Sequence, residues 1–241
     1  MIIATMCVAA TLLDAAICLA LERYLSTPWR ADVSGSPLFS WYVGALHQGI
    51  IFPVCTLIAL WPVVSGNMAV GAWLRASFSD GSAPAGCVWT HVALLAYWAK
   101  DCLVIKLSAL IWAHHVICLC AVVSSLTGLL PQSAGVFTLG SVVLELGSFA
   151  NSVCEVQPGK RGKAVRPRLT PIMLASNALA IGLVVWAAFT FDGTIRERVV
   201  WWCAAAVGTA LSALRQQEWN DRVHTDEVGQ RFRTAAPKTS R

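Results

Sequence analysis

Titratable side chains stand inside stretches of this sequence that are otherwise apolar enough for a membrane. The clearest case is IWAHHVICLC, residues 111–120, which places His114 and His115 side by side. A titratable group in hydrocarbon is costly unless it is paired or faces a cavity, so each one is a candidate functional residue. The candidates are Asp14, His47, Asp101, His114, His115 and Glu145, with Tyr97, Ser148 and Asn151 as polar companions.

The spacing of these residues predicts which of them share a helix face. Tyr97 and Asp101 are four positions apart, so on a helix they lie on one face and can address the same cavity. Glu145, Ser148 and Asn151 follow one another at intervals of three, which predicts a polar stripe toward the interior of a bundle. One thin slab of the molecule is therefore expected to hold two imidazoles and a carboxylate, more than adhesion between helices needs.

General acid–base chemistry on a lipid head group is the reaction that suits such a set. An imidazole takes a proton from an amine or hydroxyl near neutral pH, and a carboxylate can orient it. We expect His114 and His115 as base or substrate-orienting groups and Glu145 as their electrostatic partner. Asp101 is expected with Tyr97 at the mouth of the cavity, and His47, Ser148 and Asn151 should complete its polar lining.

Other chemistries fit less well. A metal site needs three or four ligands at bonding spacing, and only one bare HH pair is present, so no metal site is expected. No GxSxG motif marks a serine hydrolase. Asp14 and His47 taken singly are more typical of hydrogen bonds between helices than of chemistry, and Asp14 is expected to pair with a neighbour.

Composition indicates an integral membrane protein. The 241 residues are 56% hydrophobic and only 13% charged, with a mean hydropathy of +0.62. The net charge of +5 comes from Lys and Arg between and after the apolar stretches, which indicates membrane topology and not nucleic-acid binding. Most of the nine cysteines stand in apolar stretches as small hydrophobic residues, so structural disulfides are not expected.

Seven apolar stretches approach the roughly 20 residues that a membrane-spanning helix needs. They are 2–21, 41–64, 87–105, 107–130, 134–156, 169–191 and 196–214. The sequence thus predicts an all-α polytopic transmembrane bundle of about seven spans, an N-terminal helix plus a six-helix domain. The expected domains are an N-terminal helix and linker (1–39), the transmembrane domain (40–215) and a polar tail (216–241), disordered beyond its first turns.

Basic residues in the loops predict the orientation. The 157–168 loop holds five Lys and Arg residues and no acid, which places it in the cytoplasm. The N-terminus is then lumenal or extracellular, and the tail is cytoplasmic. By this alternation Lys100 is assigned to a linker on the cytoplasmic side.

Four short motifs, in this order, resemble the TLC-domain family, which includes the ceramide synthases and smaller lipid-linked proteins. They are SWYVGALHQ at 40–48, AYWAKD at 96–101, IWAHHV at 111–116 and LELGSFAN at 144–151. Glycine at position 147 departs from the serine of the family pattern, and the gap between Asp101 and His114 is short. The H-D-x-x-D string of the ceramide synthases is absent.

This resemblance implies lipid metabolism in the endoplasmic reticulum. A membrane lipid or acyl chain would be the partner, in a lipid-accessible cavity formed by the later six helices. No cofactor is implied unless the protein is an acyltransferase, in which case acyl-CoA would be used. Two alternatives stay open beside an enzyme: a non-catalytic lipid sensor or cargo adaptor, and a proton-coupled transporter. The oligomeric state is left open.

Overall fold

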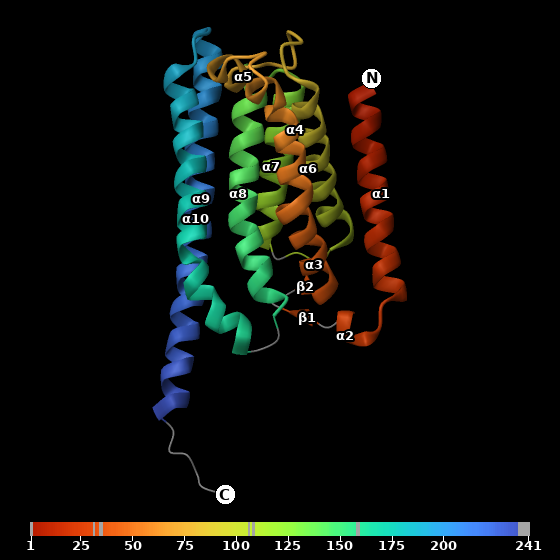
Figure 1. Ribbon diagram of the computed structural model, residues 1–241, viewed down its shortest axis with the longest axis vertical. Coiled ribbons are helices and arrows are strands. Elements are labelled where there is room, and N and C mark those ends of the chain that lie inside the picture. Colours follow the sequence, from red (N-terminus) through yellow and green to blue (C-terminus); the bar gives the residue numbers. More distant parts are fainter. Residues whose placement is uncertain are drawn as a thin grey trace, which may run out of the picture.

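Long helices packed side by side make up a computed structural model of the chain, which describes residues 2–30, 32–33, 36–105, 107, 109–157 and 160–235. Residues 109, 110, 160 and 227–235 are described by their backbone alone. Successive long helices run in opposite directions, so the connections gather at two ends (Figure 1). We call the end of the bundle with the N-terminus the upper end and the opposite one the lower end, as in Figure 1.

The helices correspond to the seven apolar stretches of the sequence. They are α1 (Ile2–Tyr24), α3 (Leu38–Leu46) continued by the π-helix η1 (His47–Ile51) and α4 (Phe52–Val64), α6 (Ala85–Val104), α7 (Ala109–Leu126), α8 (Ala134–Glu155), α9 (Lys160–Thr190) and α10 (Ile195–Ala235). Two short helices, α2 (Thr27–Arg30) and α5 (Val70–Leu74), lie in connections. The prediction of an all-α fold is confirmed, apart from a two-residue antiparallel pair, β1 (Asp32–Val33) and β2 (Ser36–Pro37).

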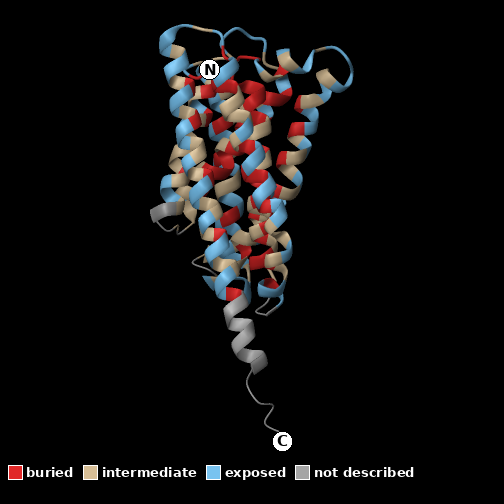
Figure 2. Ribbon diagram, turned by 90° about the vertical axis from the view of Figure 1, so that its left-hand side faces the viewer, coloured by how far each residue is buried: buried red, intermediate tan, exposed pale blue. Residues whose placement is uncertain are grey.

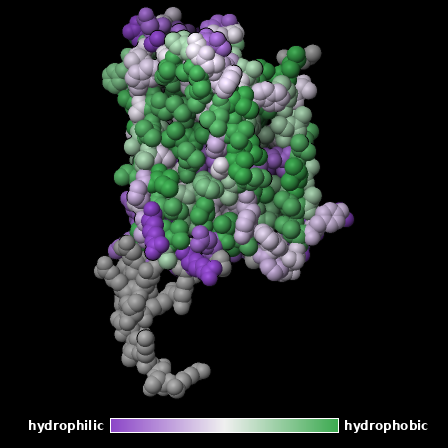
Figure 3. Space-filling view, in the orientation of Figure 1, coloured by the Kyte–Doolittle hydropathy of each residue, from purple (hydrophilic) through white to green (hydrophobic). Residues whose placement is uncertain are grey.

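Four helical segments are long and apolar enough to cross a membrane. They are Ile2–Tyr24, Leu38–Val64, Ala134–Glu155 and Arg161–Thr190, and Ile111–Leu126 is a shorter apolar helix. The face seen in Figure 3 carries a broad belt of hydrophobic side chains between more hydrophilic ends. Buried positions follow the inner faces of the helices, while α1 stands at the outer side of the bundle (Figures 1 and 2).

A π-helical turn interrupts the second long helix just before Pro53. Proline has no N–H, and its ring crowds the carbonyl four residues earlier, so an α-helix cannot continue there undistorted. The turn absorbs one extra residue, with the Phe52 N–H donating to the carbonyl of His47, five residues back. Such turns are frequent at functional sites, and this one reorients His47 and Gln48.

The structure corrects the prediction of a polar tail that is disordered beyond its first turns from residue 216. α10 continues as a helix to Ala235, and its residues 219 and 226 are buried against the bundle. The reason is an ion cluster at the lower end, in which Arg166 of α9 contacts Glu155 of α8 and Asp226 of α10 and so fixes this extension to α8 and α9. The expected domain boundary at 215 therefore falls inside a packed helix, and residues 236–241 lie outside the described part of the chain.

The 157–168 segment, expected as a loop, is also mostly helical. α9 begins at Lys160, and Pro167 and Pro171 stand inside it, where the ribbon bends (Figure 1). At the upper end α10 starts with a capping box, in which the Thr194 N–H donates to Glu197 Oε2 at 2.8 Å and the Glu197 N–H donates to Thr194 Oγ1 at 3.3 Å.

Candidate functional site

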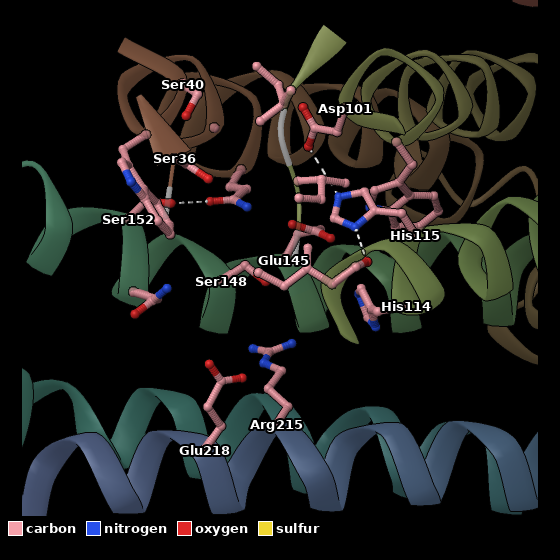
Figure 4. A pocket seen from close by; sticks show the side chains of 18 of the residues that line it. Ser36, Ser40, Asp101, His114, His115, Glu145, Ser148, Ser152, Arg215 and Glu218 are labelled. Carbon is pink, nitrogen blue, oxygen red and sulfur yellow. Dashed lines mark hydrogen bonds and ion pairs between the residues drawn. The ribbon is translucent and has the colours of Figure 1, made fainter. Parts of the chain in front are cut away.

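A cavity of about 220 Å³ lies in the lower half of the bundle (Figure 4). α3, α6, α7, α8 and α10 contribute most of its walls. Seven of the residues singled out from the sequence line it: Tyr97, Asp101, His114, His115, Glu145, Ser148 and Asn151. The twin histidines and the acid of the next long helix thus face one shared space, as the spacing predicted.

His115 is held by its neighbours on both sides of the ring. Nδ1 donates to the carbonyl of Ile111 at 2.8 Å, and Nε2 lies 3.1 Å from Asp101 Oδ2. The other oxygen of Asp101 is 2.8 Å from Lys100 Nζ. Both ring nitrogens face oxygen acceptors, which favours a ring protonated on each nitrogen and joins α6 to α7. His115 is therefore a poor base for a ligand.

Lys100 is the unexpected member of this group. The sequence analysis assigned it to a linker, whereas it lies inside α6 and is only 1% exposed. Its ammonium lies 4.5 Å from the centre of the Tyr97 ring, a cation–π contact, besides its ion pair with Asp101. Tyr97 and Asp101 both line the cavity, as their spacing predicted, while the ion pairs of Asp101 are with Lys100 and His115.

His114 has the freer ring of the two histidines. Its Nε2 lies 3.6 Å from the Cys118 thiol, a weak donor one turn further along α7. The two imidazole rings meet edge to face, with centroids 5.6 Å apart. Because His114 has no carboxylate partner within salt-bridge distance in the described part of the chain, it is the imidazole available to a ligand.

Glu145 presents a bare carboxylate oxygen. The side chain is only 4% exposed, and its Oε2 has no hydrogen-bond partner among the described residues. Leaving such an acceptor unsatisfied in a buried site costs roughly 1–3 kcal/mol or more. Glu145 and Ser148 extend from one face of α8 into the cavity (Figure 4).

Arg215 approaches the cavity from α10, opposite α8 (Figure 4). Its guanidinium lies 3.2–3.3 Å from the Met173 sulfur and 3.3 Å from Ser176 Oγ, both of them neutral groups. A Cβ at Gly147 would overlap the Arg215 side chain and Ser176 Oγ. This close approach explains why a residue without a side chain stands at 147.

Sequence reasoning missed Arg215 because it stands at the boundary that was drawn between the last span and the tail. One signal could have found it. Leu211, Arg215, Glu218 and Arg222 follow one another at intervals of four, three and four, and all of them line the cavity. A stripe of this kind predicts a helix face turned toward the interior.

Gln48 is a second residue that the sequence analysis did not single out. Its amide accepts a hydrogen bond from Ser152 Oγ at 2.9 Å and donates to the Tyr97 hydroxyl at 3.2 Å. This chain joins η1, α6 and α8 along one wall of the cavity. Asn151, expected in the lining, does reach the cavity, but its side-chain oxygen accepts from Arg166 at 3.2 Å.

The placement of His47 corrects the expected lining, because this residue is not among those that surround the cavity. Its Nε2 lies 3.1 Å from Asp14 Oδ2 on α1, and its Nδ1 donates to the Val43 carbonyl at 2.9 Å. The π-helical turn places His47 toward α1 and the next residue, Gln48, toward the interior. The prediction that Asp14 pairs with a neighbour is confirmed.

A double-mutant cycle on Asp14 and His47 is expected to give a coupling energy of about 0.6–2 kcal/mol, the range of hydrogen bonds between membrane helices. The single variants Asp14→Ala and His47→Ala and the double variant would be compared by SDS-driven unfolding in mixed micelles. A coupling energy indistinguishable from zero would show that the pair does not hold α1 to the bundle.

A third buried histidine, His91, was also missed. It is fully buried, its Nδ1 donates to the Cys87 carbonyl at 2.8 Å, and its Nε2 lies 3.1 Å from Ser125 Oγ. Ser125 in turn lies 2.7 Å from Ser133 Oγ. Since its polar atoms are engaged and it lines neither cavity described here, His91 joins the upper parts of α6 and α7 and lies outside the site.

A second cavity, of about 180 Å³, adjoins the first and lies between α7, α8, α9 and α10. Five residues line both: Trp98, His114, Glu145, Leu211 and Arg215. Beyond them the walls are mainly apolar or glycine, up to Leu130 and Trp201 near the upper end. We call the first cavity the polar chamber and the second the apolar chamber. His114, Glu145 and Arg215 stand at their junction.

Comparisons with protein-family models, with curated proteins and with solved structures give no match for this chain. The resemblance to the TLC-domain family therefore stays a prediction from four short motifs.

Proposed function

We propose that this chain is an integral membrane protein of seven spans that binds a membrane amphiphile and acts in lipid metabolism. One observation carries the proposal: the polar chamber and the apolar chamber lie side by side with shared walls, and the titratable groups His114, Glu145 and Arg215 line both of them. A head group and a hydrocarbon chain require this sequence of environments. A bundle held together only by scattered polar contacts would need neither chamber.

The orientation of the bundle in the membrane is also part of this proposal. The lower end, with the basic 157–168 segment, faces the cytoplasm, and the N-terminus faces the lumen of the endoplasmic reticulum. The ligand's head then lies at the cytoplasmic side of the membrane and its chain extends toward the lumenal side.

His114 and Glu145 are the groups that could exchange a proton with a bound head group. Purified protein that consumes a labelled amphiphile would be an enzyme, whereas protein that returns it unchanged would be a carrier or a sensor. The loop charges and the two chambers fit either form of lipid handling, and both depend on binding, which is tested first.

Gly140 offers a way to fill the apolar chamber without disturbing the fold. It lines that chamber, and a Cβ built there has nothing within 4 Å. Gly182 on α9 is a matched control, since its Cβ also has nothing within 4 Å but the residue is exposed and lines neither chamber. A large side chain at position 140 therefore tests the apolar chamber, and the same side chain at position 182 tests the cost of a bulky residue on a helix.

We expect Gly140→Phe to weaken binding of a spin-labelled single-chain lysophospholipid at least about tenfold, because the phenyl ring occupies the space of several methylene groups. Gly182→Phe should bind like wild type. The immobilised fraction in the electron paramagnetic resonance spectrum of purified protein measures both. Equal binding by wild type and Gly140→Phe would contradict an acyl chain in this chamber.

A further inference from the structure

The charged residues around the polar chamber differ in whether they already have a partner. Asp101 is paired with Lys100 and His115. Glu218 and Arg222 are paired with each other at 2.6 Å. These residues are satisfied within the protein and have little free capacity to bind a ligand.

Glu145 and Arg215 are the exception among the charged lining residues that the structure describes. Glu145 leaves Oε2 without a partner among the described residues, and the Arg215 guanidinium contacts the Met173 thioether and the Ser176 hydroxyl. The two residues line both chambers, yet no nitrogen–oxygen distance of 4.0 Å or less joins them. Opposite charges of this kind therefore stand at one junction without forming an ion pair.

Such an arrangement is unfavourable in an empty site. Charges in a medium of low dielectric constant are stable when they are paired and hydrogen-bonded. The Arg215 side chain is held in place by close contact with Gly147 of α8 and Ser176 of α9. A ligand that carries one group for each of them would restore the missing interactions. That ligand needs a cationic donor for Glu145 and an anion for Arg215.

We propose that the ligand is a single-chain amphiphile whose head carries both an ammonium and an anionic group. The ammonium donates to Glu145, the anion binds the Arg215 guanidinium beside His114, and the chain lies in the apolar chamber along Gly140 and Gly208. A guanidinium binds phosphate or carboxylate equally well in geometry, so both anions belong to this class.

The size of the chambers favours one chain over two. Each chamber, at about 220 and 180 Å³, is below the roughly 300–1,000 Å³ of pockets that hold drug-sized ligands. The apolar chamber is also bordered by the helices on its sides and ends near Leu130 and Trp201. This inference rests on the proposed function and specifies its ligand.

Head-group selectivity tests the inference on the unaltered protein. Competitors of equal chain length would displace the spin-labelled lysophospholipid: lysophosphatidylethanolamine, lysophosphatidylcholine, lysophosphatidic acid, a long-chain amine and a long-chain 2-amino acid. We expect lysophosphatidylethanolamine to bind about tenfold more tightly than the choline, phosphatidic acid and amine compounds, since each lacks one charge-assisted hydrogen bond. The 2-amino acid distinguishes a carboxylate from a phosphate preference.

Variants then assign each half of the head. Glu145→Gln should abolish the preference for lysophosphatidylethanolamine over lysophosphatidic acid. Arg215→Gln should abolish the preference for lysophosphatidylethanolamine over the long-chain amine. Arg215→Lys should retain part of the preference over the long-chain amine, because lysine keeps the positive charge. Equal affinity for all head groups, with Gly140→Phe still blocking them, would overturn the head-group assignment but leave the proposed function. Failure of every compound to bind would overturn both.

Discussion

Replacing Arg166 by alanine is expected to lower the free energy of unfolding by about 3–5 kcal/mol, the usual cost of removing one partner from a buried ion pair. Arg166 is 7% exposed and donates to Glu155 Oε1 at 2.9 Å and to Asp226 Oδ2 at 3.1 Å. Its removal leaves two buried carboxylates without their main cation. Arg222 and Lys163 still contact one acid each, at 3.2 and 3.5 Å, which limits the loss.

SDS-driven unfolding of purified Arg166→Ala in mixed micelles measures this loss. Arg168→Ala is the control, because Arg168 is exposed two positions further along α9. Surface substitutions of this kind usually change stability by about 0.5 kcal/mol or less. If both variants lost the same small amount, the cluster would not stabilise the lower end of the bundle.

The same cluster explains the wrong prediction for the tail. Asp226 and Trp219 are buried because Arg166 connects α8, α9 and α10, with its guanidinium also 5.6 Å from the centre of the Trp219 ring. In the sequence these charges stand in segments that look like solvated loop and tail. Only the approach of segments 60 residues apart converts them into a buried network, and no local pattern shows it.

The course of the chain was more predictable than its contacts. Runs of about 20 apolar residues mark the helices, because each must bury its backbone polar groups internally whatever surrounds it. The π-helical turn was partly visible in Pro53, which cannot continue an undistorted helix. The start of α9 at Lys160 could not be predicted from the sequence, since the polar segment around Pro167 resembles a loop until its partners are known.

The site shows the same limit. Helical spacing places Glu145 and Ser148 on one face, and the structure confirms that both line the polar chamber. Spacing cannot show that His115 is engaged by Asp101 while His114 contacts the weakly polar Cys118 thiol, because that depends on which helix lies opposite. Arg215 was missed for the same reason, as a cation near a span end is ordinarily free to reach water.

Removing Asp101 is the second change with a large expected effect. Asp101→Leu leaves the ammonium of Lys100, 1% exposed, without its counter-ion 2.8 Å away. We expect a loss of about 3–5 kcal/mol in the free energy of unfolding, because an unpaired buried charge costs more than the pair contributes. The cation–π contact of Lys100 with Tyr97 compensates only in part.

The double variant Lys100→Met with Asp101→Leu distinguishes a buried charge from a merely lost contact. It removes more interactions than Asp101→Leu does, yet it should lose only about 1–2 kcal/mol, since no unpaired ammonium remains and His115, without Asp101, can release one ring proton and stay neutral. SDS-driven unfolding of the two variants beside wild type measures the difference. A double variant less stable than the single one would mean that Lys100 reaches water, and Asp101 would then hold α6 to α7 through His115 alone.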